Sequence, residues 1–420
     1  MVNTILSTFD AGLDQNNPIS RFLWHATHTV RLQSSSTYEQ SSWISLYSKL
    51  EELGVKVETY EPSNIDLEED IKLLEKSIQE SDIVVHGNEL LRGNALSNGL
   101  ISIMNQFSLV RRSPFISKDL ASRVDELING KYLHKSHISL PEDYGLDKLI
   151  ATRRMQKAGI PTPETMEVEE YLATRDGPAV LKPRVLYQGN SVLYLEKEQI
   201  ERFFDEKTWH GKHGKVRARN IPQPGKYFVQ EFIETPSDRF TSYRVVAVGD
   251  IIVGCVITAS GQTKSEIMNG VKAKDFYQIL ARMFNTYPIV SNVAAGGIQI
   301  PVSHDSYKQF RELEEWEKQA LMAHNIDPDN LGIPEPLRKL ATSAGRVAAK
   351  YGLLISGQDW LQDRDGRVYF SEVNKYPALG LEIFNTLFLG GRGKEKQIQQ
   401  VAEYQIADAL QKYNPPNLVR

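Results

Sequence analysis

The segment ISGQDWLQDRDGRVYFSEVNKYPALGLE contains the pattern of a tight β-hairpin. Strand-forming residues occupy Leu353–Leu361 and Arg367–Asn374, and Asp363–Gly366 between them has the composition of a turn. Side chains on a strand alternate between its two faces, so the turn sets the face of every residue that follows it. We expect this turn to pair Gln362 with Arg367. The chain must therefore bring two polar strands side by side near its C-terminal end.

The register of this hairpin decides where its acidic side chains lie. It places Asp359 opposite Phe370, and Glu372 and Asn374 follow on that face because of the period of two. Two carboxylates and one amide oxygen would then converge. Such oxygens, with room for water and phosphate, are what Mg²⁺ prefers. The alternative is a surface hairpin with ordinary polar residues.

The residues around the hairpin resemble the metal-binding signature of the ATP-grasp superfamily. Asp359 begins DWL, and thirteen residues later Glu372 begins EVN, followed by Pro377 and GLE. The similarity is nearest to the ribosomal-protein glutamate ligase and the glutathione synthetases, and it spans roughly residues 147–410. It implies that Asp359, Glu372 and Asn374 bind Mg²⁺, with Mn²⁺ as an alternative. The family often has Pro-Gly where this chain has Pro-Ala.

The same resemblance implies a nucleotide site built from upstream segments that recur in the family's order. Its ATP-binding candidates are Lys148 before a helix, Lys182 in VLKP, Gln188, Gly189 and Ser191 in a small loop, Glu231, Phe232 and Ile233 at a hinge, and Asp238 or Glu234 for the ribose. Lys182 also has a physical rationale. A lysine that ends an apolar strand is costly to bury unless it meets an anion.

Two further residues are catalytic candidates by resemblance. Arg244, in SYRVVAVGD, matches a family arginine that contacts phosphate or substrate, and its planar fork of donors suits a phosphoryl oxygen or a carboxylate. The alternative for Arg244 is a solvent-facing residue paired with Asp250. Asn292, which follows Ser291 and precedes two glycines, resembles the segment beside the triphosphate and the acceptor. The alternative for Asn292 is an ordinary turn residue.

The first third of the chain alternates between strands and helices. Short strands are predicted at residues 4–9, 55–60 and 83–86, with amphipathic helices at 42–53 and 66–80 between them. This alternation favours a mostly parallel sheet covered by helices. No glycine-rich nucleotide fingerprint is present, so we interpret this part as a supporting or substrate-facing domain.

The fold class that follows is α/β, with α+β character in the C-terminal part. We expect an ATP-grasp fold preceded by a Rossmann-like α/β pre-grasp domain. The expected domains are 1–145, an N-terminal α/β pre-ATP-grasp domain; 146–235, a central or lid subdomain; and 236–420, a C-terminal subdomain with the metal site. Further expected elements are a helix that ends at Gly159, a hairpin that turns at Gly249-Asp250 and an amphipathic helix at 335–351.

The composition narrows the classes of function. The 420 residues carry a net charge of −4, so nucleic-acid binding through a whole-surface field is not expected. The only cysteine, Cys255, excludes an intrachain disulfide and a cysteine-based metal site, and we expect it in the core. No segment approaches the ~18–20 apolar residues of a spanning helix. We therefore expect a soluble cytoplasmic protein without a membrane or nucleic-acid partner.

One basic segment has two interpretations. WHGKHGKVRARN, at Trp209–Asn220, would place Lys215, Arg217 and Arg219 on one strand face beside the nucleotide site. This row either attracts an acidic substrate or protects a solvated edge strand from pairing.

The function implied by the resemblance is an ATP-dependent carboxylate–amine ligase. Such an enzyme forms an amide or peptide bond through an acyl phosphate and releases ADP and phosphate. Its partners would be small-molecule or peptide carboxylates and amines, and a homodimer is compatible with it. The alternatives are an ATP-grasp kinase that phosphorylates a small-molecule hydroxyl, and a non-catalytic ATP-binding regulatory module.

Overall fold

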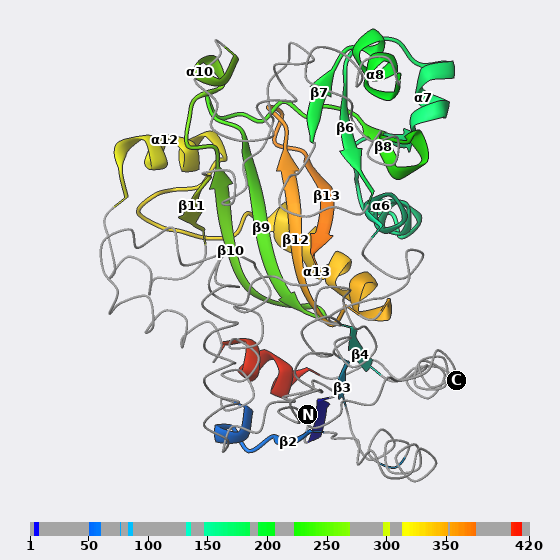
Figure 1. Ribbon diagram of the computed structural model, residues 1–420. Helices are drawn as coiled ribbons and strands as arrows, with labels where there is room; N and C mark the ends of the chain where they lie inside the picture. The colour runs from blue at the N-terminus through cyan, green and yellow to red at the C-terminus, as the bar shows by residue number, and fades with distance from the viewer. Residues whose placement is uncertain are drawn as a thin grey trace, which may run out of the picture.

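The computed structural model of the chain shows helices and strands arranged around three β-sheets (Figure 1). The residues that it describes are 4–7, 50–59, 76, 83–86, 132–135, 147–184, 192–205, 222–268, 297–302, 313–351, 353–374 and 405–413. Within this part of the chain, both parallel and antiparallel sheets are present, so the mixed helix-and-strand class expected from the sequence is confirmed.

The N-terminal sheet is parallel and has the strand order β2-β1-β3-β4. Its strands are β1 (Thr4–Ser7), β2 (Lys56–Thr59), β3 (Ile83–His86) and β4 (Tyr132–Lys135). The three strands predicted from the sequence are found, and β4 is an addition. Most of both predicted helices, at 42–53 and 66–80, lies outside the described residues, although residues 50–52 and 76 are helical. The Rossmann-like character of this part therefore stays a prediction.

The middle sheet is antiparallel, in the order β5-β8-β6-β7. Its strands are β5 (Thr165–Glu167), β6 (Ala179–Pro183), β7 (Leu193–Leu195) and β8 (Tyr227–Gln230), the last preceded by the 3-10 turn η3 (Pro224–Lys226). The helices α7 (Val168–Thr174) and α8 (Lys197–Phe204) pack on it. Their buried side chains, Tyr171, Ile200 and Phe203, share one core with Leu181 and Val229.

The helix α6 (Lys148–Lys157) leads into this sheet. The Asp147 carboxylate caps it by accepting from the backbone N–H groups of Leu149 and Ile150, at 3.0 and 3.2 Å. The helix ends before Gly159, whose φ of 76° is the left-handed conformation that glycine adopts most readily, as predicted. Lys148, as the first residue of the helix, is thereby fixed next to the sheets.

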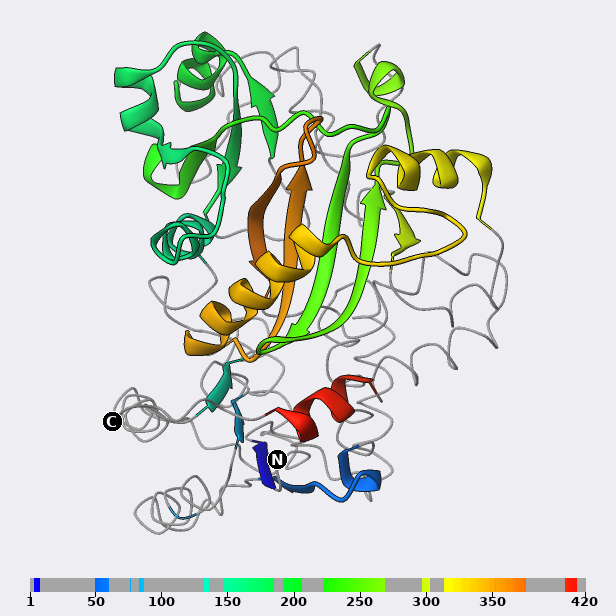
Figure 2. The same ribbon diagram turned by 180° about the vertical axis from the view of Figure 1, so that it is seen from behind.

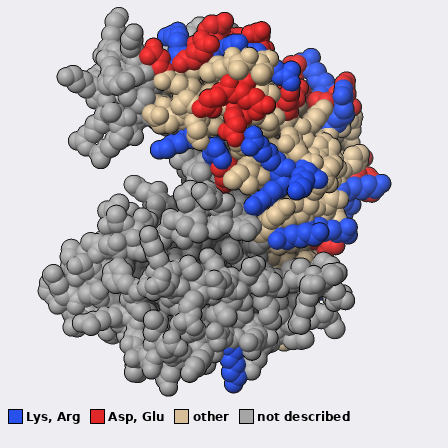
Figure 3. Space-filling view, turned by 90° about the vertical axis from the view of Figure 1, so that its right-hand side faces the viewer, with Lys and Arg blue, Asp and Glu red and all other residues tan. Residues whose placement is uncertain are grey.

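The surface of this region carries both signs of charge. Glutamates begin α7 and basic residues end α6, and Figure 3 shows acidic side chains gathered above a band of basic ones on this face. Several neighbours form exposed ion pairs, among them Lys197 with Asp176 at 3.0 Å and Arg153 with Glu167 at 3.2 Å. Exposed pairs of this kind contribute little to stability. The core beneath them, rather than this surface, therefore holds the elements in place.

The third sheet is five-stranded and antiparallel throughout, in the order β11-β10-β9-β12-β13. Its strands are β9 (Thr241–Val248), β10 (Ile251–Ala259), β11 (Ile298–Pro301), β12 (Ile355–Gln362) and β13 (Val368–Asn374). The predicted turn between β9 and β10 is confirmed, with Gly249 at φ 55°. A short helix, α10 (Lys264–Met268), follows β10.

One face of the five-stranded sheet is covered by helices (Figure 2). These are α12 (Glu315–Ala323) and α13 (Glu335–Lys350). The apolar side of α13, with Leu337, Ala341 and Ala344, joins the sheet core, as the predicted amphipathic helix requires. Cys255 is 1% exposed in that core, as expected. The opposite face of the sheet is left for the pocket described below.

The register of the β12–β13 hairpin differs from the sequence prediction. Gln362 pairs with Val368 and Trp360 pairs with Phe370, so the predicted Asp359–Phe370 pair is wrong. A β-bulge then shifts the register, and Asp359 lies opposite Glu372. Because of the extra residue, Phe370 faces the core while Glu372 lines the pocket. The two carboxylates converge as expected. They do so because of a β-bulge, which a strict alternation of side chains between the two faces of a strand does not predict.

The C-terminal residues return to the N-terminal part of the molecule. Residues 405–412 are helical and lie beside the parallel sheet (Figure 1). The Gln411 side-chain amide donates to the Leu53 carbonyl at 2.6 Å, which joins the two regions. In the part of the chain that the structure describes, no helix has both the length and the apolar character needed to cross a membrane.

Candidate functional site

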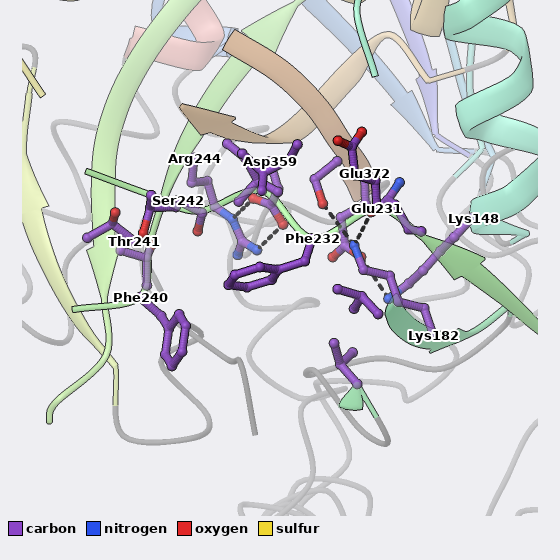
Figure 4. A pocket seen from close by; sticks show the side chains of 18 of the residues that line it. Lys148, Lys182, Glu231, Phe232, Phe240, Thr241, Ser242, Arg244, Asp359 and Glu372 are labelled. Carbon is purple, nitrogen blue, oxygen red and sulfur yellow. Dashed lines mark hydrogen bonds and ion pairs between the residues drawn. The ribbon is translucent and has the colours of Figure 1, made fainter. Parts of the chain in front are cut away.

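A pocket lies between the middle sheet and the five-stranded sheet (Figure 4). Its unfilled space of about 980 Å³ includes volume that is open to solvent. The predicted site residues that line it are Lys148, Lys182, Glu231, Phe232, Ile233, Arg244, Asp359 and Glu372. These residues come from separate strands, a helix and a connecting segment. The fold therefore brings together residues that are distant in sequence.

An ion pair closes one end of the pocket. Lys148 Nζ lies 2.7 Å from Glu372 Oε2, and both side chains are largely buried. Burial alone would raise the pKa of Glu372, but the ammonium groups of Lys148 and Lys182 outweigh it and lower this pKa to about 2. Glu372 is therefore an anion at neutral pH, held among cations.

The second lysine lies deeper in the same wall. Lys182 is 8% exposed, and its ammonium donates to Gln230 Oε1 at 2.5 Å and to Ser371 Oγ at 3.1 Å. Burial lowers the pKa of Lys182 to about 8, opposed by the charge of Glu372. A buried ammonium held by neutral oxygens retains a strong preference for an anion.

The middle of the pocket is formed by an arginine–aspartate pair. Arg244 on β9 and Asp359 on β12 are register partners, and their side chains form two parallel hydrogen bonds of 2.8 Å (Figure 4). Burial raises the pKa of the Asp359 carboxyl, and the guanidinium of Arg244 opposes this effect. The alternative pairing of Arg244 with Asp250 is wrong, because Asp250 accepts from Arg346 at 3.0 Å.

The third residue of the expected metal set adjoins both carboxylates. Asn374 Nδ2 lies 3.0 Å from Asp359 Oδ2 and 3.4 Å from Glu372 Oε1. The described residues contain no group of three or more side chains of the histidine, cysteine, aspartate or glutamate type that is placed to hold a metal ion. Two carboxylates with one amide, completed by phosphate oxygens and water, nevertheless match the ligands of Mg²⁺. The donor chemistry thus fits the ion.

Phe232 and Ile233, in the segment predicted to be a hinge, contribute to the apolar part of the pocket. Phe232 packs against Tyr194 and Phe240, with ring centroids 4.9 and 6.4 Å apart, and Ile233 lies beside it. The neighbouring Glu231 is tied to the middle sheet, because its backbone N–H donates to the Glu164 carbonyl at 2.8 Å. A planar apolar ligand would find contact here.

Some expected residues do not reach the pocket. Glu234 forms an ion pair with Arg364, and Asp238 accepts from the Ser237 hydroxyl at 3.4 Å; neither ribose candidate lines the pocket. Other predicted features lie outside the described residues, namely Gln188, Gly189, Ser191, Asn292, Pro377 and the basic segment 209–220.

Several pocket residues were not predicted. They are Gln230, Thr235, Phe240, Thr241, Ser242, Thr258, Gln299, Leu361 and Ser371, among others. One signal could have identified Gln299, which interrupts the apolar run of β11 as Lys182 interrupts that of β6. A buried network behind the wall was also missed. In it, His324 Nε2 lies 2.9 Å from Thr241 Oγ1, and His324 Nδ1 lies 2.8 Å from Gln362 Oε1.

Comparisons with known proteins give matches among solved structures only. No family model matches the sequence, and no curated protein matches it. The structure of the ATP-grasp ligase PsnB, complexed with minimal precursor, is similar at a TM-score of 0.44 and 13% identity, over 98% of this chain and 99% of that one. D-cycloserine synthetase DcsG is similar at 0.42 and 12%, over 96% and 99%.

A third similar structure is the D-alanine–D-alanine ligase from Bacillus anthracis complexed with ATP. Its TM-score is 0.38 at 12% identity, over 98% of this chain and 100% of that one. The chain is thus similar, at low identity, to solved structures of ATP-grasp ligases along nearly its whole length.

Proposed function

We propose that this protein is an ATP-dependent carboxylate–amine ligase with an ATP-grasp fold. The proposal rests on one observation, which is that Lys148, Lys182 and Arg244 line the same pocket as the carboxylates of Asp359 and Glu372. Three cations close to two anions suit a triphosphate that brings a divalent cation with it. A site for an uncharged ligand would have no use for so many buried charges, because each costs desolvation.

ATP would bind with its base at the hinge and its phosphates at the lysines. Phe232 and Ile233 offer apolar contact to a purine ring, and Lys148 and Lys182 line the same pocket. Figure 4 shows both lysines together with Phe232. The loop with Gln188, Gly189 and Ser191 is proposed to cover the phosphates, as the sequence resemblance implies. Glu231 is the pocket carboxylate nearest in sequence to the hinge aromatics, whereas the ribose candidates Asp238 and Glu234 do not line the pocket.

Asp359, Glu372 and Asn374 would hold Mg²⁺. When bound, the ion neutralises charge on the phosphates and holds them in line with the attacking group. In the structure the two carboxylates are paired with Arg244 and Lys148. These cations would then be free to bind phosphoryl oxygens, because the metal would take over their carboxylate partners.

The reaction would proceed in two displacements. The substrate carboxylate attacks the γ-phosphorus of ATP, the bond to the β-phosphate oxygen breaks, and an acyl phosphate and ADP result. An amine then attacks the acyl carbon, phosphate leaves, and the amine loses a proton. Arg244 would stabilise charge on the phosphoryl group, and Arg244 or Asn292 would stabilise the oxyanion of the second step.

The pocket favours a ligase over a kinase. A hydroxyl needs a base to accept its proton, whereas a carboxylate attacks as it is. The carboxylates that line the pocket are Asp359, Glu372 and Glu231. The first two are held by cations, and Glu231 Oε2 accepts from the Glu164 backbone N–H at 3.2 Å. The described lining residues include no histidine, and each of these carboxylates already accepts from another group.

The domain division at 145 and 235 is proposed with this function. The pocket lies where the middle sheet and the five-stranded sheet face each other, which suits closure of one on the other to exclude water from the acyl phosphate. A cytoplasmic location fits the single buried cysteine. The amine and the carboxylate would be small molecules or peptides, and a homodimer is compatible with the proposal.

Trapping with hydroxylamine tests this function. The purified protein is incubated with ATP, Mg²⁺, hydroxylamine and panels of amino acids, small acids and peptides, and hydroxamate and ADP are measured. A ligase produces both in equal amounts and only when an acid is present. ADP with a phosphorylated alcohol and without hydroxamate would instead identify a kinase. ATP binding without any turnover would identify a regulatory module.

A further inference from the structure

The pocket wall contains one side chain whose hydrogen-bonding groups the described part of the chain leaves unused. Gln299 lies on β11, lines the pocket and is 1% exposed. Both polar atoms of its carboxamide, Nε2 and Oε1, are buried without a hydrogen-bond partner. An amide buried in this way destabilises the fold, because its bonds to water are lost and not replaced. The usual partners of such a group are a bound ligand or an ordered water.

Gln299 belongs to a row of polar residues that crosses the sheet. Thr258 is the register partner of Gln299 on one side and of Ser242 on the other, and all three line the pocket. Arg244 lies two residues beyond Ser242 on the same face of β9. From strand spacing and rise, the Cα atoms of Arg244 and Gln299 are about 12 Å apart. A ligand of a few bonds could therefore reach from the Arg244–Asp359 pair to Gln299.

The chemistry of the side chain selects the group that it would bind. Nε2 donates and Oε1 accepts, so both are satisfied by a ligand that presents a carbonyl oxygen and an N–H on one side. A single trans amide has these groups on opposite edges, but an extended peptide or N-acyl amino acid presents the N–H and the carbonyl oxygen of one residue on the same side. A carboxylate or a phosphate only accepts, and its oxygen would face the lone pairs of Oε1. The purine ring of ATP also has such an edge. Phe232 packs on Phe240, which precedes β9, and β10 lies between β9 and β11, so the binding experiment below includes the nucleotide as an alternative occupant.

We propose that Gln299 binds an amide group of the carboxylate substrate, so that the substrate is an N-acyl amino acid or a peptide. This assignment rests on the proposed ligase function and names the class of acid that the enzyme takes. Gln299 is then a specificity residue. It rejects acids without an amide, because their binding leaves the carboxamide unpaired.

A second buried glutamine on the same sheet provides a matched control. Gln358 on β12 is fully buried, but its Nε2 donates to the Ala341 carbonyl at 3.1 Å and its Oε1 accepts from Trp360 Nε1 at 3.2 Å. Its partners lie within the protein, on the α13 side of the sheet. Replacing Gln358 removes structural hydrogen bonds, whereas replacing Gln299 removes none that the described residues make.

The experiment measures binding rather than turnover. Calorimetry compares N-acetyl amino acids with their ester analogues, in which oxygen replaces the amide N–H, in the presence of a non-hydrolysable ATP analogue and Mg²⁺. We expect the best N-acetyl amino acid to bind the wild type at least tenfold more tightly than its ester. In Gln299→Met, which keeps the volume, this preference should disappear, while the affinity for the ATP analogue changes less than twofold.

Thermal unfolding separates this role from a structural one. The Gln299→Met variant should unfold at the same or a higher temperature than the wild type, whereas Gln358→Met should unfold at a lower temperature and keep the amide preference. Gln299→Leu, which also has no oxygen to accept from the amide N–H, should also lose the preference. This second variant serves if Gln299→Met does not fold.

Three results would overturn the assignment. These are that no N-acetyl amino acid binds, that amide and ester bind the wild type equally, or that Gln299→Met weakens the ATP analogue as much as the acid. The last result would place the nucleotide at Gln299. Hydroxamate formation without an amide preference removes this assignment and leaves the ligase. An amide preference without hydroxamate formation would keep Gln299 as an amide-binding residue and remove the ligase function.

Discussion

Lys148, the first residue of α6, forms its ion pair with Glu372, the residue that follows the bulge of β13. The helix cap at Asp147 holds one partner and the bulge turns the other into the pocket. A nucleotide site that uses both residues therefore depends on two local features, a helix N-terminus and a strand irregularity. The ion pair between Lys148 and Glu372 also connects α6 to the five-stranded sheet.

Replacing Glu372 with glutamine should abolish turnover while the protein stays folded. The substitution keeps the size of the side chain but removes one of the two proposed anionic ligands, so Mg²⁺ would be held less well. We expect kcat to fall by about 100-fold or more. Phosphate release measures activity, and near-ultraviolet circular dichroism checks the fold. Wild-type rates of phosphate release would contradict the metal assignment.

Replacing Lys182 with methionine should weaken ATP binding by about 10- to 100-fold, because the apolar stem remains and the charge that we propose meets phosphate is lost. The pKa of Lys182 is about 8 before ATP binds, so wild-type affinity should also decline as the pH rises above 8 and the ammonium loses its proton. Calorimetry at pH 7 and pH 9 measures both effects. A pH dependence that persists unchanged in Lys182→Met would show that another group causes it.

The buried His324 should make the fold sensitive to acid. Burial lowers its pKa to about 4, compared with roughly 6.5 in an unfolded chain. The unfolded state therefore takes up the proton first as the pH falls. This contribution to stability is complete above about pH 6.5 and is lost between about pH 6.5 and pH 4. The expected loss from this residue is about 2 kcal/mol between pH 7.5 and pH 5.

Urea unfolding of the wild type and of His324→Gln at these two pH values tests this prediction. The variant should be less stable at pH 7.5, because the bonds to Thr241 and Gln362 are disturbed. Its additional loss at pH 5 should be smaller than that of the wild type by about 2 kcal/mol. Equal losses in the two proteins would mean that His324 is protonated in the native state.

Two glycines of the large sheet and its helix should respond differently to alanine. A Cβ at Gly345 on α13 would lie 1.9 Å from the backbone oxygen of Gly249, which cannot move aside as a flexible side chain does. Gly345→Ala should destabilise the fold by about 2–4 kcal/mol. At Gly254 on β10, the same addition meets nothing within 4 Å, so Gly254→Ala is the control and should change stability little. Denaturant midpoints compare the two, and similar values would contradict close packing of α13.

The sequence by itself determined the local elements and the chemical character of the pocket. The helix that begins at Lys148 and ends before Gly159, the turn at Gly249 and the hairpin with Asp359 follow from caps, turn residues and periodicity, which act over a few residues. The sequence also indicated that Lys182 has an anionic partner, because a lysine in an apolar strand is rarely buried without one. These signals are short-range and can be observed directly in the sequence.

Only the tertiary structure decided which residues meet. The bulge that turns Glu372 toward Asp359 depends on core packing of Trp360 and Phe370 against the helices, and periodicity does not contain it. The pairing of Arg244 with Asp359 depends on the order of strands in the sheet. In the sequence Gln299 is only a polar residue in an apolar run, and its lack of hydrogen-bond partners is visible only when the sheet is assembled. Long-range contacts arise from packing of the whole chain, and local sequence does not specify them.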